Sequence, residues 1–179
     1  MTTRFRMRAA LPAAFLALAL TVLFVPEATA IWVPQTRAEF VDAVAKGTKG
    51  AKMESFVVNR GFDEVVRTLE ARCTPCLDVK VERVANVGYV ERSSSDYNPE
   101  LKRVGKDRAE FTMQVIHRPR GVGHTPPPNG LYVMAADFRR AGVGKTEMIL
   151  YRPVMGFKNI SKALLAWAEG TTTDCPKMK

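Results

Sequence analysis

The chain has 179 residues with 27 Lys and Arg against 18 Asp and Glu, a formal net charge of +9. This length is enough for one domain with a real core. The basic residues are scattered, which indicates a solvated surface that could also lie against an anionic lipid surface. Nucleic acid is not expected as a partner, because the export argued next places the chain outside the cytoplasm.

Residues 1–30 have the features of a secretory signal peptide. A basic start is followed by an apolar run over Ala9–Val25, and Ala28-Thr29-Ala30 has the small-x-small pattern of a signal-peptidase site. At 17 residues the run is near the lower limit for a membrane anchor, but the cleavage pattern favours removal. We expect cleavage near Ala30, no transmembrane segment in the mature chain, and a periplasmic or secreted location.

Residues 31–50 are expected to form a short N-terminal helix and a linker. Thr36 and Glu39 have the spacing of a capping box, in which each side chain satisfies a free backbone N–H at a helix start. Gly47 ends the apolar periodicity, and residues 47–50 have the composition of a linker.

The clearest helix begins at Phe62, after a short strand predicted over residues 55–59. Its apolar residues fall at helical spacing up to Cys73, with charged residues on the opposite face. Pro75 lacks an N–H and disfavours helix at the preceding residue. The helix is therefore predicted to end at Cys73, with Cys76 lying beyond it.

The remainder alternates between strand-like and polar segments, followed by a final helix. The predicted strands cover residues 79–89, 111–115, 131–138 and 146–152, and the apolar stripe of the last helix covers 160–168, ending at Gly170. A long polar turn is expected over 93–108, a Pro-rich loop over 118–130 and a hairpin over Ala141–Gly144.

Short connections between consecutive strands predict an antiparallel sheet, because parallel neighbours need long crossovers. The expected fold is α+β, with a two-layer arrangement of about five strands packed against two to three helices and residues 51–179 forming a single domain. From "SFVVNRGFDEVVRTLEA" to "ISKALLAWAEG", about residues 54–170, the order of elements resembles the helix-grip arrangement of START-type domains. The resemblance implies an apolar ligand, such as a lipid, between the sheet and the C-terminal helix. The side chains expected to contact it are Phe62, Val66, Leu69, Leu164 and Trp167.

Cys73 and Cys76 form a C-x-x-C pair, and its position relative to the preceding helix indicates whether it is a redox centre. A thioredoxin-like pair opens a helix, whereas this pair follows one, where the helix dipole would raise the pKa of a thiol. Nothing in the spacing brings His117 or His124 to these cysteines, so no metal and no cofactor is expected. The pair is better explained as part of a disulfide that ties down the C-terminal tail. Cys76–Cys175 is favoured because Cys73 lies on the apolar face, and Cys73–Cys175 is the alternative.

No spacing in the sequence supports an acid, base or nucleophile constellation, so no catalytic residue is assigned. The sequence predicts a non-enzymatic binding module of the bacterial cell envelope, holding a lipid or another apolar small molecule. One alternative is an interaction domain that contacts an envelope protein through an exposed strand or the Pro-rich loop around Thr125–Pro128. A second alternative is a thiol-disulfide protein that uses Cys73 and Cys76.

Overall fold

The computed structural model describes residues 33–86, 90–120 and 130–178. The predicted signal peptide, His124 and the Thr125–Pro128 segment lie outside these residues. Residues 33–179 form one compact unit. Its elements in chain order are α1 (Arg37–Ala45), β1 (Ala51–Val58), α2 (Phe62–Leu77), β2 (Val79–Asn86), β3 (Val90–Gly105), β4 (Arg108–Arg120), β5 (Leu131–Arg140), β6 (Thr146–Pro153) and α3 (Lys158–Glu169).

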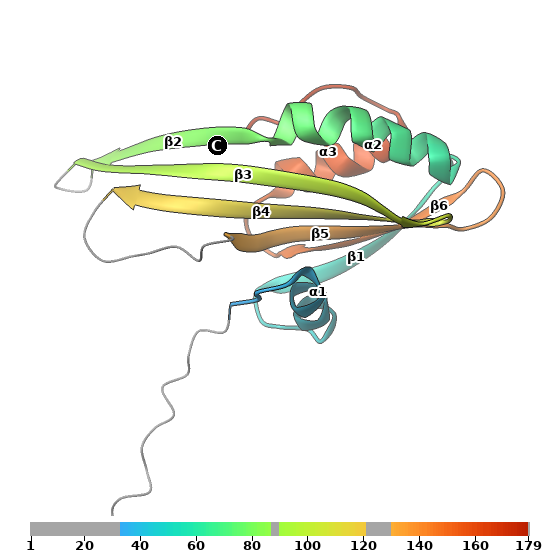
Figure 1. The fold of residues 1–179 in the computed structure, drawn as a ribbon, viewed down its shortest axis with the longest axis horizontal. Coiled ribbons are helices and arrows are strands. Elements are labelled where there is room, and N and C mark those ends of the chain that lie inside the picture. Colours follow the sequence, from blue (N-terminus) through green and yellow to red (C-terminus); the bar gives the residue numbers. More distant parts are fainter. Residues whose placement is uncertain (1–32, 87–89, 121–129, 179) are drawn as a thin grey trace, which may run out of the picture. The chain divides into compact units, whose positions relative to one another are not determined.

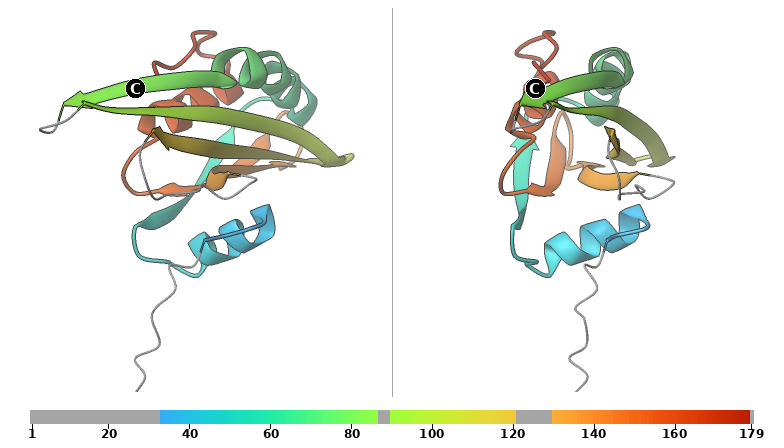
Figure 2. Two further views of the ribbon diagram at one scale, coloured as in Figure 1. Left: turned by 60° about the vertical axis from the view of Figure 1, so that its left-hand side comes forward. Right: turned by 90° about the vertical axis from the view of Figure 1, so that its left-hand side faces the viewer.

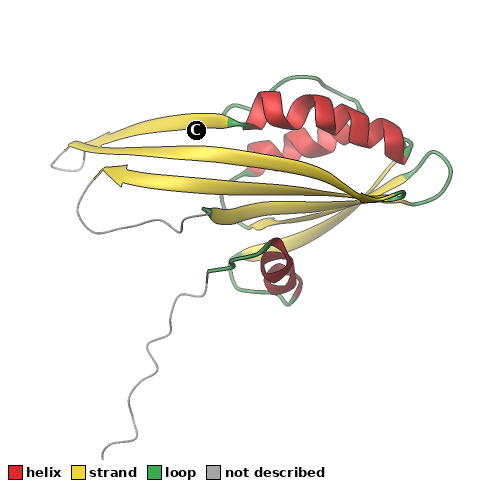
Figure 3. Cartoon of the chain, in the orientation of Figure 1, coloured by secondary structure: helices red, strands yellow, loops and turns green. Residues whose placement is uncertain are grey.

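All neighbouring strands of the sheet are antiparallel, in the order β1-β6-β5-β4-β3-β2. α2 and α3 lie side by side on one face of the sheet (Figures 1 and 3). The sheet curves around these two helices (Figure 2). This confirms the predicted α+β, helix-grip-like fold, with six strands in the described chain where about five were expected.

The core fills the space between the curved sheet and the two helices. Its largest fully buried side chains include Trp167, Phe62, Phe111 and Phe138, which come from α3, α2, β4 and β5. Alternating residues of each strand point into this space, as the period of two predicts. The last helix ends at Gly170 as expected, because this residue takes a left-handed conformation with φ of 73°.

A smaller apolar cluster lies on the other face of the sheet, under α1. Phe40 and Val44 of α1 pack there against Ala135 and Tyr151 of the sheet. The N-terminal helix therefore belongs to the folded unit and adds a partial third layer to the two that were expected. At its start the Thr36 hydroxyl accepts the predicted hydrogen bond from the Glu39 N–H, at 3.2 Å.

The prediction that α2 ends at Cys73 is wrong. The helix continues through Pro75 to Leu77, and the Asp78 N–H donates to the Thr74 carbonyl at 3.0 Å. Pro75 removes one backbone bond, but the extra turn buries Cys76 and Leu77 at 4% and 0% exposure. Burial of these side chains offsets the lost bond, and it places both cysteines of the C-x-x-C pair on the helix.

The prediction of a long turn over residues 93–108 is also wrong, because β3 runs through most of this segment. It is paired along its length with β4, and with β2 up to Tyr97. Its polar residues suit a strand whose outer face meets solvent, while Tyr97 and Leu101 face the core. Pro99 is tolerated because β2 begins opposite Tyr97, so that β3 has only one neighbour at the proline.

Candidate functional site

The C-terminal tail is fixed across the two core helices by a disulfide and by hydrogen bonds. Cys76 at the end of α2 is bonded to Cys175, the favoured of the two pairings that the sequence left open. The Trp167 indole N–H donates to the Asp174 carbonyl at 3.0 Å, and the Asn159 side chain donates to the Lys177 carbonyl at 3.2 Å. Since Trp167 is near the end of α3 and Asn159 at its start, the tail runs back along the helix.

Cys73 is a buried free thiol. Burial raises its pKa to about 12. A thiol with this pKa stays protonated at neutral pH, and the protonated form is a poor nucleophile. With Cys76 already bonded to Cys175, the two residues do not form the paired thiols that a thiol-disulfide enzyme would need.

Iodoacetamide should therefore leave Cys73 unmodified in the folded protein. At about pH 8 almost none of this thiol is ionised, and the surrounding core excludes the reagent. Unfolding in guanidinium chloride without reductant should expose the thiol and allow one alkylation, which mass spectrometry of the intact protein would count. Equal labelling rates for the folded and unfolded protein would contradict the buried position.

The side chains that the sequence assigned to ligand contact come together in the core. These residues, all 0% exposed, are Phe62, Val66, Leu69, Leu164 and Trp167. They pack against one another and against the sheet, and none of them lines the pocket described next.

A pocket of about 450 Å³ lies beside the start of α3. It is bounded by β2, β3, the loop between β6 and α3, and the C-terminal tail. Apolar parts of its lining come from Tyr97, Met155, Phe157, Ile160 and Met178. The Tyr97 and Phe157 rings meet edge to face with their centroids 6.3 Å apart, which fixes one wall. The pocket volume is within the range of about 300–1,000 Å³ that small-molecule sites occupy.

The polar part of the lining comes from Arg83, Lys158, Asn159 and Lys177. α3 begins here without a side-chain cap and without an acidic residue in its first turn. The field at this end of the helix is therefore positive and is not neutralised by the helix itself.

Sequence reasoning missed this pocket because most of its residues lie in segments without a periodic pattern. Met155 and Phe157 belong to a connecting loop, Lys177 and Met178 to the tail, and Tyr97 to the segment predicted as a turn. The spacing of Tyr97 and Leu101 was the one feature that could have indicated the strand. They are an even number of residues apart, so in a strand both apolar side chains lie on the same face.

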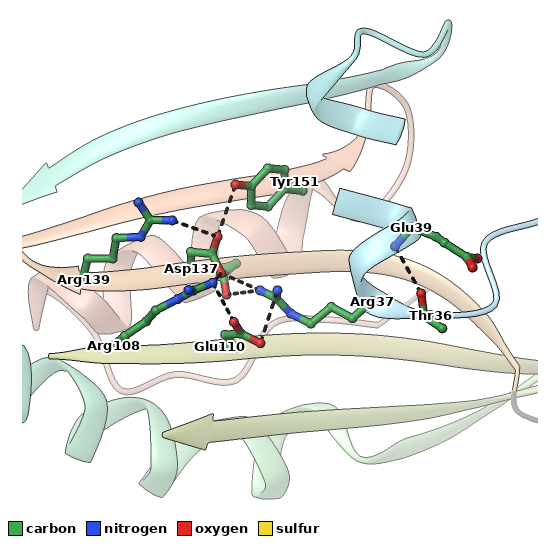
Figure 4. Close-up of polar contacts among 9 residues, drawn as sticks. Thr36, Arg37, Glu39, Arg108, Glu110, Asp137, Arg139 and Tyr151 are labelled. Carbon is green, nitrogen blue, oxygen red and sulfur yellow. Dashed lines mark hydrogen bonds and ion pairs between the residues drawn. The ribbon is translucent and has the colours of Figure 1, made fainter. Parts of the chain in front are cut away.

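A second group of polar side chains joins α1 to the outer face of the sheet (Figure 4). The Arg37 guanidinium donates to Asp137 at 2.7 Å and lies 3.3 Å from Glu110. The Tyr151 hydroxyl donates to Asp137 at 3.2 Å, and burial together with this carboxylate raises the pKa of Tyr151. Arg108 also contacts Glu110, at 2.8 Å. These charged groups pair with one another, although the buried Arg37 Nε has no hydrogen-bond partner among the described residues, and the arrangement suits a structural role in anchoring α1.

The described residues offer no metal centre, since no three His, Cys, Asp or Glu side chains among them are placed to hold an ion. His117 instead lies with Nδ1 3.1 Å from the Ser95 hydroxyl. Among the described helices, none is both long and apolar enough to span a bilayer.

Comparison with known proteins finds only distant similarity. No family model matches the chain, and no curated protein sequence matches it significantly. A solved structure from Chromobacterium violaceum is similar over 70% of this chain and 98% of its own, at 12% identity and a TM-score of 0.35. The di-domain ARO/CYC StfQ from the steffimycin biosynthetic pathway is similar over 68% of this chain and 43% of its own, at 12% identity and a TM-score of 0.31. The Zhui aromatase/cyclase from a Streptomyces species is similar over 56% of this chain and 64% of its own, at 13% identity and a TM-score of 0.22. Likenesses this distant say nothing of the ligand or activity of this chain.

Proposed function

We propose that the protein is an exported, non-enzymatic binding module that holds an apolar small molecule in the pocket beside the start of α3. The signal-peptide features of residues 1–30 support export to the bacterial cell envelope or beyond. The Cys76–Cys175 disulfide supports the same location, because such bonds persist in oxidising compartments.

The observation that carries the proposal is the pocket with its apolar walls. Met155 is 82% exposed, and Met178 is half-buried beside it in the lining. Methionine side chains are unbranched and adapt to the shape of a ligand. The described lining offers Lys and Tyr side chains but no carboxylate or histidine to pair with them as an acid–base set, which favours binding over catalysis.

Binding of decanol, measured by isothermal titration calorimetry, tests this function. Replacing Met155 with serine should weaken the affinity about tenfold, because a methionine side chain buried on binding contributes about 1.5 kcal/mol. The fold should be unaffected, since most of this side chain is exposed in the free protein.

Met53→Ser is the matched control. Met53 is also exposed, at 52%, but lies on β1 and does not line the pocket. This variant should bind decanol like the parent protein. Absence of decanol binding to the parent, together with no co-purified small molecule in native mass spectrometry, would rule out the proposed function.

A further inference from the structure

The charges around the pocket are of one sign. Arg83, Lys158 and Lys177 line it, and its described lining includes no Asp or Glu. The other end of the sheet is different, because Arg103 and Arg140 there share the Asp63 carboxylate at 2.8 Å each. The pocket thus combines apolar walls with basic residues, Lys158 and Lys177 among them.

Two of these basic residues, Lys158 and Lys177, belong to segments that are bonded to each other. The hydrogen bond from Asn159 to the Lys177 carbonyl fixes this part of the tail against the first turn of α3, which contains Lys158. Within the described part of the chain, neither lysine side chain has an ion-pair or hydrogen-bond partner. A solvated surface lysine needs no partner. What distinguishes this pair is the apolar pocket that both residues line.

We propose that the pocket takes a single-chain amphiphile with an anionic headgroup. Its chain would contact Tyr97, Phe157 and Ile160, and its headgroup would lie near Lys158 and Lys177. The positive charges favour a ligand with an anionic headgroup. The apolar walls contact the chain of the ligand equally well whatever the headgroup is. The inference rests on the proposed function and names the class of ligand.

Decanoate and decanol separate the headgroup from the chain, because the two probes have the same number of carbon atoms. By calorimetry at low salt, the parent protein should bind decanoate about tenfold more tightly than decanol, and added salt should reduce this preference. The double variant Lys158→Glu/Lys177→Glu should bind decanoate no more tightly than decanol. Lys102→Glu/Lys145→Glu, with the same change of net charge at exposed residues outside the lining, should retain the preference.

The outcomes distinguish this inference from the proposed function. Equal affinities of the parent for both probes would overturn the anionic headgroup and leave the apolar pocket intact. Failure of both probes to bind, with no small molecule co-purified, would remove the proposed function itself. A third outcome is that the parent binds decanol without preferring decanoate, but sediments with phosphatidylglycerol vesicles in a way that depends on Lys158 and Lys177. The lysines would then bind a membrane surface, and the proposed anionic amphiphile would be wrong.

Discussion

Removal of the Cys76–Cys175 disulfide is expected to lower the free energy of unfolding by about 2–4 kcal/mol. The bond joins residues 99 positions apart, so it restricts most of the unfolded chain. The chain-entropy estimate for a loop of this length is about 4.7 kcal/mol, and measured effects are often smaller. For a domain of this size the melting temperature should fall by about 4–16 °C.

The double variant Cys76→Ala/Cys175→Ser tests this expectation in urea unfolding followed by circular dichroism. Cys73→Ala is the matched control, because it removes a buried sulfur from the same helix and leaves the disulfide in place. The control should cost about 1 kcal/mol. If the double variant is no less stable than the control, the disulfide does not contribute as argued.

The same double variant should also bind decanol several-fold more weakly. Lys177 and Met178 form one wall of the pocket, and the disulfide is the covalent link that holds their segment. Without it the tail depends on the hydrogen bonds from Trp167 and Asn159. A mobile wall must be ordered when the ligand binds, which reduces the affinity.

Strong periodic patterns predicted the elements of the fold well. The apolar spacing from Phe62 placed the start of α2 correctly, and the Ala141–Gly144 turn connects β5 and β6 as expected. β3 was missed because its pairing with β2 and β4 stabilises a strand whose own residues are mostly polar. The end of α2 was missed because burial of Leu77 overrides the local preference of Pro75.

The pocket could not have been predicted in the same way, because it exists only when distant segments meet. Tyr97, Phe157 and Met178 line the same pocket because β3, the β6–α3 loop and the C-terminal tail meet there, and the Cys76–Cys175 disulfide holds the tail in place. The pairing of Cys175 with Cys76 rather than Cys73 could be predicted, because the apolar stripe of the helix assigned Cys73 to the core. The position of Lys177 depends on that disulfide and on the hydrogen bond from Asn159 to the Lys177 carbonyl. Neither contact can be predicted from the spacing of apolar residues in the sequence.

Replacing Asp137 with asparagine is expected to lower the free energy of unfolding by about 2–4 kcal/mol. The Asp137 side chain is only 3% exposed, and Arg37, 19% exposed, donates to it at 2.7 Å. Asparagine preserves the shape but removes the negative charge, so a largely buried guanidinium loses its nearest countercharge. Glu110 lies farther from Arg37, at 3.3 Å, and also pairs with Arg108, so it compensates only in part.

Asp42→Asn provides the control on α1 itself. Asp42 is 60% exposed and pairs with the exposed Lys46, so this variant should change stability by less than about 0.5 kcal/mol. A double-mutant cycle with Arg37→Met isolates the pair, because the second substitution removes the charge that Asp137→Asn leaves unpaired. The double variant should therefore lose less stability than the two single variants added together. Strict additivity would mean that Arg37 and Asp137 do not stabilise one another, and that the apolar contacts of Phe40 and Val44 alone hold α1 on the sheet.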